Sequence, residues 1–144
     1  MGVPLGYRED MTHVSTTDLD RVLASLDPQP SGTYVFSLVD EIPQGVDFFA
    51  VIRDEDGYTV VVEQEIAREA GINADELYTR IDLGSSTELA AIGITASIAQ
   101  ILAARSITAN FIACRRHDHL FVQPDRAQEA SALLEDLGRR AKGW

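Results

Sequence analysis

Gly93, in the second half of the chain, lies where a helix start could bind an anion. It follows a run of small residues, and the apolar residues after it recur at helical spacing, so a helix is predicted to begin at Gly93-Ile94-Thr95. The first N–H groups of a helix have no partner within it, which suits a carboxylate or a phosphate. A glycine here also fits a turn that binds nothing.

Three polar side chains are candidates to complete such a site. Asn110 lies in a predicted strand and can bond either to a ligand or to nearby backbone. Asp118 is expected in a turn beside the cleft, where its carboxylate can bind a ligand's ammonium group. Glu88 is the third candidate for the ammonium. Together these residues predict a site for a zwitterion.

His117 and His119 are spaced so that a strand would present both side chains to one metal ion. Two ligands are too few, and only Asp118 between them adds a third donor. A hydrogen-bonded hairpin turn at His117-Asp118 is the ordinary explanation. We therefore predict no metal and no cofactor.

No enzyme motif is present: the sequence has no G-x-S-x-G, no Walker loop, no G-x-G-x-x-G and no cysteine pair. We therefore expect no catalysis. The single cysteine, Cys114, lies in a predicted strand and reads as a small core residue. It cannot form an internal disulfide, which favours a reducing compartment.

Charge and hydropathy limit the partners. The net charge of −11 over 144 residues argues against binding nucleic acid, because phosphate backbones repel an acidic surface. No run approaches the roughly 18–20 apolar residues that span a bilayer, and no signal peptide is recognisable. We expect a cytoplasmic protein that binds no membrane.

Hydrophobic periodicity predicts alternating helices and strands. After a loose tail, the first half is expected to hold a helix at 18–26, a loop at 27–32, strands at 33–39, 48–53 and 58–63, and a helix at 64–70 closed by Gly71. Asp56-Gly57 predicts a hairpin between the second and third strands. The second half is expected to hold strands at 78–83, 107–115 and 119–123, with helices beginning at Gly93 and Asp125, the latter ending at Gly138.

This order gives most of two β-α-β-β-α-β units, neither of them complete. We therefore predict strand exchange within the chain. The strand at 77–84 would lie at the junction, and the strand at 33–39 would complete the second sheet.

Residues 85–123 resemble the C-terminal half of small two-part ACT-domain proteins, which look distantly related to the cytosolic arginine sensor. The resemblance is carried by Ser85-Ser86 with Glu88, by 92–95, by 107–110, by His117-Asp118-His119 and by 121–123. Relatives usually have glycine before the second strand, where this chain has Arg105-Ser106.

The resemblance implies an α+β, ferredoxin-like ACT fold of two halves, each with an antiparallel sheet and helices on one face. The expected division is a tail at 1–15, a first half at 16–76 and a second half at 77–141. It also implies ligand contacts from matching positions: Ser85, Ser86, Glu88, Ile92, Gly93, Ile94, Thr95, Asn110, Ile112 and Asp118.

The predicted function is non-catalytic regulation through binding of an amino acid or related metabolite, in a homodimer. The alternative is a protein–protein interaction module whose ligand pocket is vestigial.

Overall fold

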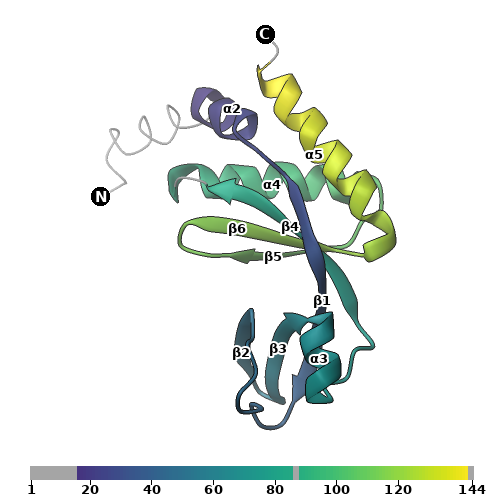
Figure 1. The fold of residues 1–144 in the computed structure, drawn as a ribbon. Helices are drawn as coiled ribbons and strands as arrows, with labels where there is room; N and C mark the ends of the chain where they lie inside the picture. The colour runs from purple at the N-terminus through teal and green to yellow at the C-terminus, as the bar shows by residue number, and fades with distance from the viewer. Residues whose placement is uncertain (1–15, 86–87, 143–144) are drawn as a thin grey trace, which may run out of the picture.

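The computed structural model describes residues 16–85 and 88–142, and the side chains of residues 20–84 and 93–141. Four helices, six strands and a short 3-10 helix are described in these residues (Figure 1). Their order is α2 (Thr16–Ala24), β1 (Gln29–Val39), β2 (Ala50–Asp54), β3 (Gly57–Glu63), α3 (Gln64–Ala70), β4 (Leu77–Ser85), α4 (Glu88–Ala104), β5 (Ala109–Ala113), β6 (His117–Val122), η1 (Pro124–Arg126) and α5 (Ala127–Lys142). None of these helices is long and apolar enough to cross a membrane.

The six strands form one antiparallel sheet in the order β2-β3-β1-β4-β6-β5. The four strands β2-β3-β1-β4 have the order of one ferredoxin-like unit, and β5-β6-β4-β1 have the order of another. β1 and β4 therefore belong to both units and run between the two groups of helices (Figure 1). This confirms the predicted strand exchange and the α+β fold.

The first unit lacks one of the two helices of the ferredoxin-like pattern. β1 connects to β2 through residues 40–49, which contain neither helix nor strand. α3 is thus the one helix between strands of this unit. The hairpin between β2 and β3 turns at Asp54–Gly57, as the Asp56-Gly57 pair predicted, and Gly71 ends α3 with a φ of 69°.

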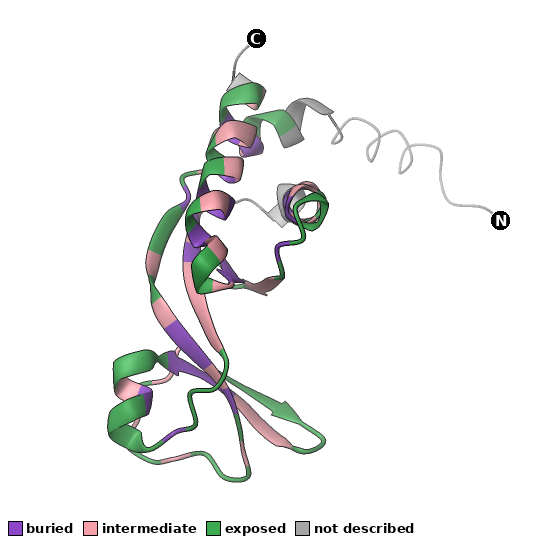
Figure 2. Ribbon diagram, turned by 90° about the vertical axis from the view of Figure 1, so that its right-hand side faces the viewer, coloured by how far each residue is buried: buried purple, intermediate pink, exposed green. Residues whose placement is uncertain are grey.

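The helices pack on one face of the sheet because alternate strand residues on that face are apolar. Beneath α2, α4 and α5 the core joins Leu23, Ile81, Leu83, Ile94, Ile98, Leu102, Ile107, Leu120, Val122, Ala127, Ala130 and Leu134. Beneath α3 a smaller core joins Val35, Val60, Val62, Ala67 and Ile72. Buried residues lie along the strands in both cores (Figure 2).

The prediction that the last helix ends at Gly138 is wrong. α5 continues to Lys142, and Gly138 lies where the helix meets α2. A Cβ atom at this position would lie 3.2 Å from the carbonyl oxygen of Leu23. The glycine is therefore explained by close helix packing and not by a helix end.

α4 begins at Glu88, five residues before the predicted start at Gly93. The N–H groups of residues 93–95 thus lie inside the helix, where the regular hydrogen-bond pattern uses them. At the other end, Ile107 N donates to Leu102 O and Ser106 N donates to Ala103 O. This is a Schellman motif, and Ser106 takes its left-handed position with a φ of 58°. Relatives usually have a glycine here, and Ser106 therefore occupies a backbone position that favours glycine.

Three further boundaries differ from the prediction. β1 begins at Gln29 instead of residue 33, because a bulge at Gly32 lets the chain pair with β4 on both sides of it. His117 and Asp118 lie in β6 and not in a turn, since the hairpin turns at residues 114–116. Cys114 is exposed just beyond β5 and is not a core residue.

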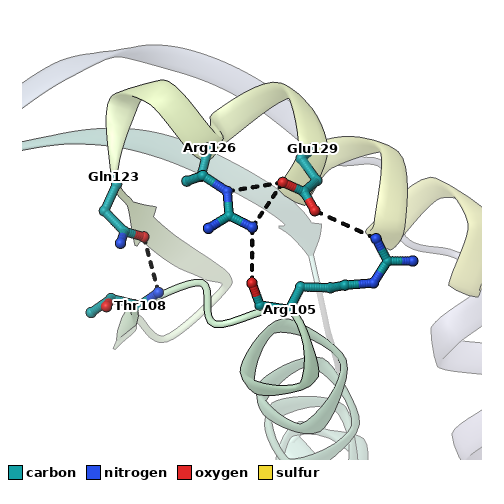
Figure 3. A network of polar contacts seen from close by, with 5 residues as sticks. All are labelled: Arg105, Thr108, Gln123, Arg126 and Glu129. Carbon is teal, nitrogen blue, oxygen red and sulfur yellow. Dashed lines mark hydrogen bonds and ion pairs between the residues drawn. The ribbon is translucent and has the colours of Figure 1, made fainter.

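Polar contacts tie the end of α4 to the start of α5 (Figure 3). Arg126 donates from Nη2 to the carbonyl oxygen of Arg105 at 2.8 Å and from Nε to Glu129 at 2.9 Å. The hydrogen bond from Arg126, with the nearby charge of Arg105, lowers the pKa of Glu129. Gln123 accepts from Thr108 N at 2.9 Å. These contacts fix the connection between α4 and β5.

Candidate ligand-binding site

The face of the sheet opposite the helices carries an aromatic cluster. Tyr34, Val61 and Phe121 are its buried members, and Phe36, Phe49, Ala50, Tyr78 and Ile112 pack against them. Phe121 is fully buried, and its ring meets those of Tyr34, Phe36 and Phe49 edge to face at 5.1–5.7 Å. We call this set the aromatic cluster. Its edge-to-face ring contacts form an aromatic surface on the helix-free face.

Arg80 projects from β4 onto this same face. Its Cζ atom lies 5.3 Å from the ring centroid of Tyr34 and 5.4 Å from that of Phe49. Nε is buried without a hydrogen-bond partner, which costs about 1–3 kcal/mol for a buried polar group. Among the described side chains, those of residues 20–84 and 93–141, no carboxylate lies within ion-pair distance of this guanidinium. The aromatic rings hold the charge in place but accept no in-plane hydrogen bond.

His119 is the hydrogen-bond partner of Arg80, with Nη1 and Nδ1 3.0 Å apart. A guanidinium only donates, so Nδ1 accepts and the neutral imidazole carries its proton on Nε2. His119 is 8% exposed, and its ring lies 5.0 Å from that of Phe49. Burial, reinforced by the charge of Arg80, lowers the pKa of His119 below its ordinary value. His119 is therefore a neutral acceptor at physiological pH.

Asp82 and His117 continue this polar row toward the end of β4. Asp82 Oδ1 accepts from Gly84 N at 2.9 Å, where a φ of 84° at the glycine interrupts the pairing with β6. His117 Nδ1 lies 3.8 Å from the same Asp82 oxygen, and its ring is 6.5 Å from that of His119. In the described part of the chain, no three His, Cys, Asp or Glu side chains are placed to bind a metal ion.

A groove of about 550 Å³ opens beside the aromatic cluster. It is lined by Phe36, Ser37, Leu38, Thr59, Asn73, Asp75, Glu76, Tyr78 and Asn110. The Phe36 and Tyr78 rings, 4.8 Å apart, supply its apolar surface. Amides and carboxylates supply its polar surface. The volume of the groove falls within the range typical of small-molecule sites, and its lining is more polar than is usual for them.

The turn before β4 positions the acidic side of the groove. Asp75 N donates to Asn73 Oδ1 at 2.8 Å, which closes an Asx turn. Glu76 O accepts from Phe36 N at 3.1 Å, so the turn is joined to β1. Tyr78 Oη lies 3.4 Å from Glu76 Oε2. Two carboxylates and two aromatic rings beside one hollow suit an ammonium group.

The predicted ligand residues fall on both faces of the sheet. Asn110 and Ile112 are paired with Phe121 and His119, so they lie on the helix-free face, and Asn110 lines the groove. Asp118 lies on the same face of β6 as Leu120, the face that packs beneath the helices, and is buried, 7% exposed. Asp118 and Asn110 therefore do not converge on one ammonium group.

The other predicted residues belong to the junction of β4 and α4. Ile94 is 2% exposed and packs in the core beneath α4, so its side chain is not free to meet a ligand. Gly93 and Thr95 lie within α4. Ser86 lies outside the described residues, as do the side chains of Ser85, Glu88 and Ile92.

Arg80, His119 and the acidic turn were missed as site residues. A usable signal was Arg80 in the middle of Tyr78-Thr79-Arg80-Ile81-Asp82, a charged residue within a predicted strand. The topology places that strand in the centre of the sheet. Asn73 to Glu76 carried a turn signal only, because their place beside Phe36 depends on long-range pairing.

Comparisons with solved structures agree with this architecture. A Vibrio cholerae protein of unknown function, described as a possible transport protein, is 36% identical, with a TM-score of 0.74 and coverage of 85% of this chain and 97% of its own. A protein from Agrobacterium tumefaciens is 18% identical, with a TM-score of 0.64 and coverage of 78% and 89%. The regulatory subunit of aspartate kinase from Thermus flavus is 10% identical, with a TM-score of 0.56 and coverage of 78% and 95%. The last two show a shared fold alone.

No curated protein matches the sequence. Two family models, each described as an ACT domain, match residues 15–79 and 73–136. ACT domains are regulatory, non-catalytic domains that generally bind small molecules and often dimerise, so these matches support a regulatory, ligand-binding role in general. Together with the interlocked ferredoxin-like units and the 36% identical structure, they identify this chain as a member of the ACT-domain family.

Proposed function

We propose that this chain is a non-catalytic regulatory protein that senses an amino acid or a related metabolite bearing an amino group. The observation that carries the proposal is the groove on the helix-free face, because it brings the predicted residue Asn110 together with Asp75, Glu76 and aromatic rings. The proposed ammonium partner is thus the acidic turn, whereas the sequence predicted Asp118, Asn110 or Glu88.

The chemistry of the groove supports a ligand that has both an amino group and an oxygen acceptor. Asp75 and Glu76 attract a cation, and a hydrogen bond between an ammonium group and a carboxylate is stronger than a neutral hydrogen bond. The faces of Phe36 and Tyr78 add cation–π attraction. The side-chain amide of Asn110 can donate to a carbonyl or carboxylate oxygen of the same ligand. The ligand's opposite end contacts β5.

The groove also gives the proposal a regulatory route. Its lining comes from β1, β3, the turn before β4, β4 itself and β5, so it spans strands of both ferredoxin-like units. A ligand that binds one packing of these strands better than another shifts the population of the two packings. A partner protein, or the second subunit of the proposed cytoplasmic homodimer, would respond to that shift.

The junction of β4 and α4 remains a second predicted contact region, with Ser85, Ser86, Glu88, Ile92, Gly93 and Thr95 as its residues. Ile112 and Asp118 also remain predicted ligand residues. Substituting the groove residues separately from these residues tells the two regions apart.

Thermal-shift screening against the twenty amino acids and their decarboxylated amines tests the proposal. A ligand at about 100 times its dissociation constant adds about 2.7 kcal/mol of stability. The Glu76→Gln and Asn110→Ala variants should lose that gain. Asp54→Asn, at the hairpin tip outside the groove lining, should keep it and is the matched control. A flat screen at millimolar concentrations would reject ligand sensing.

A protein–protein interaction module is the second candidate, favoured by large exposed apolar side chains. Leu38, Ile42, Val51 and Ile52 are 39–59% exposed, and the latter two belong to the edge strand β2. An edge strand with apolar side chains is a template for pairing with another chain. Light scattering distinguishes the candidates: an assembly that forms identically with and without metabolites favours the interaction module.

A further inference from the structure

We infer that Arg80 forms a second site on the helix-free face, which binds the carboxylate of a small organic acid. This inference does not rest on the proposed function, since Arg80 is not among the residues that line the groove. It rests on the guanidinium of Arg80, which is partly buried without a carboxylate partner among the described side chains of a strongly acidic protein.

The acids of this chain outnumber its lysines and arginines by 23 to 12, yet Arg80 has no carboxylate partner among the described side chains of residues 20–84 and 93–141. The nearest acid along β4 on the same face is Asp82, which accepts from Gly84 N and lies beside His117. Other arginines of the described chain do form ion pairs, among them Arg68, Arg105, Arg126, Arg139 and Arg140. A partly buried cation that lacks such a partner is unusual, because taking charge out of water is costly unless it is paired.

The guanidinium is held ready for an incoming anion. Tyr34 and Phe49, whose rings also contact each other, hold it through cation–π contacts, and His119 accepts a hydrogen bond from Nη1. Nη2 has no partner among the described residues. The Nη1–Nη2 edge therefore retains donors in the fork geometry that matches the two oxygens of a carboxylate.

Of the neighbouring titratable groups, His119 favours the same ligand class, whereas the Asp82 carboxylate on the same face opposes it. His119 is neutral and accepts from Arg80, so it adds no repulsion toward the cation and can donate from Nε2. His117 and Asp82 flank it on the same face, and Asp118 lies on the opposite face of β6. An anion bound at Arg80 favours the protonated form of His119 and should raise its pKa, which supplies a readout independent of any activity.

NMR titration of the full chain at pH 7.5 tests the inference. The probes are sodium succinate, inorganic phosphate and sodium chloride at matched ionic strength, read at the Arg80 Nε–Hε and His119 Cε1–H signals. Succinate should give saturable shifts at both signals and raise the pKa of His119. Equal shifts with chloride, shifts with phosphate alone, or a linear unsaturable response would overturn the carboxylate site.

Two arginine variants complete the test. Arg80→Lys keeps the charge but loses the fork, so succinate affinity should fall about tenfold. Arg53→Lys is the matched control, since Arg53 also lies over a ring, that of Tyr58 at 5.9 Å, but is exposed at the sheet edge. Glu76→Gln should leave the succinate titration unchanged, which separates this site from the groove. An unchanged affinity in Arg80→Lys would overturn the inference, and the wild-type titration decides it if that variant does not fold.

Discussion

Arg80 donates a hydrogen bond across two neighbouring strands to Nδ1 of His119, 3.0 Å away, and thereby fixes the imidazole in its neutral form. Protonating His119 would put a proton on the acceptor atom and a second positive charge beside the guanidinium. The charge state of His119 is therefore coupled to the packing of β4 against β6.

The first prediction is that stability falls with acidity just below neutral pH because of His119. Its pKa in the folded protein is lowered by burial and by Arg80, whereas the unfolded chain titrates near the ordinary value of about 6.5. Below that value the unfolded state binds the proton more readily, so unfolding becomes easier, by up to about 1.4 kcal/mol per pH unit for one proton. Above it, this contribution is fully present.

Urea unfolding of wild type and of His119→Gln at pH 5.5 and 7.5 measures this effect. The variant should lose less stability than wild type between the two values. His117→Gln, at an exposed residue on the same strand, should change the pH dependence less than His119→Gln does. Equal pH dependence of wild type and His119→Gln would show that the buried imidazole is not responsible.

The second prediction concerns Ser106, which occupies the left-handed position after α4. Residues with a side chain are strained there, so Ser106→Gly should stabilise the protein by about 0.5–1 kcal/mol. Ala132→Gly, at an exposed site within α5, should instead destabilise it by about that amount, because glycine weakens a helix interior. Chemical denaturation of both variants measures the opposite signs; a loss of stability in Ser106→Gly would contradict the assignment.

The third prediction concerns Gly138, where α5 approaches the backbone of α2. Gly138→Leu should cost about 1–3 kcal/mol, because even the first side-chain atom would press on the Leu23 carbonyl oxygen at 3.2 Å. Gly138→Ala should gain less than the roughly 0.5–1 kcal/mol that this exchange usually gives in a helix. Thermal unfolding measures both variants, with Ala132→Leu as the control at an exposed site of the same helix. A stable Gly138→Leu would mean that the helices separate easily.

The fourth prediction is that the two ferredoxin-like units unfold as one. Each needs β1 and β4 to complete its four strands, so neither keeps its order when the other opens. Far-UV and near-UV circular dichroism should give coincident urea transitions. A fragment of residues 77–142, which lacks β1, should not fold alone. Two separate transitions, or a folded fragment, would show that the units are independent.

The sequence allowed the element types and the strand exchange to be predicted, because hydrophobic alternation and the Asp56-Gly57 and Gly71 signals act locally. The helix boundaries predicted at Gly93 and Gly138 were wrong, because the role of these glycines depends on tertiary packing, which hydrophobic periodicity does not report. Asn110, chosen from its place in a strand, does line a hollow. Its companions Asp75 and Glu76 come from a turn 34 to 35 residues earlier, joined to it only through the sheet.

Chemical-shift mapping is the measurement that tests the central claim, ligand binding in the groove, most directly. The account predicts that the stabilising amino acid or amine from the screen shifts the side-chain amides of Asn73 and Asn110 and the backbone amides of Glu76 and Tyr78 in a saturable way. Shifts confined to residues 85–95, with these four residues unchanged, would contradict it.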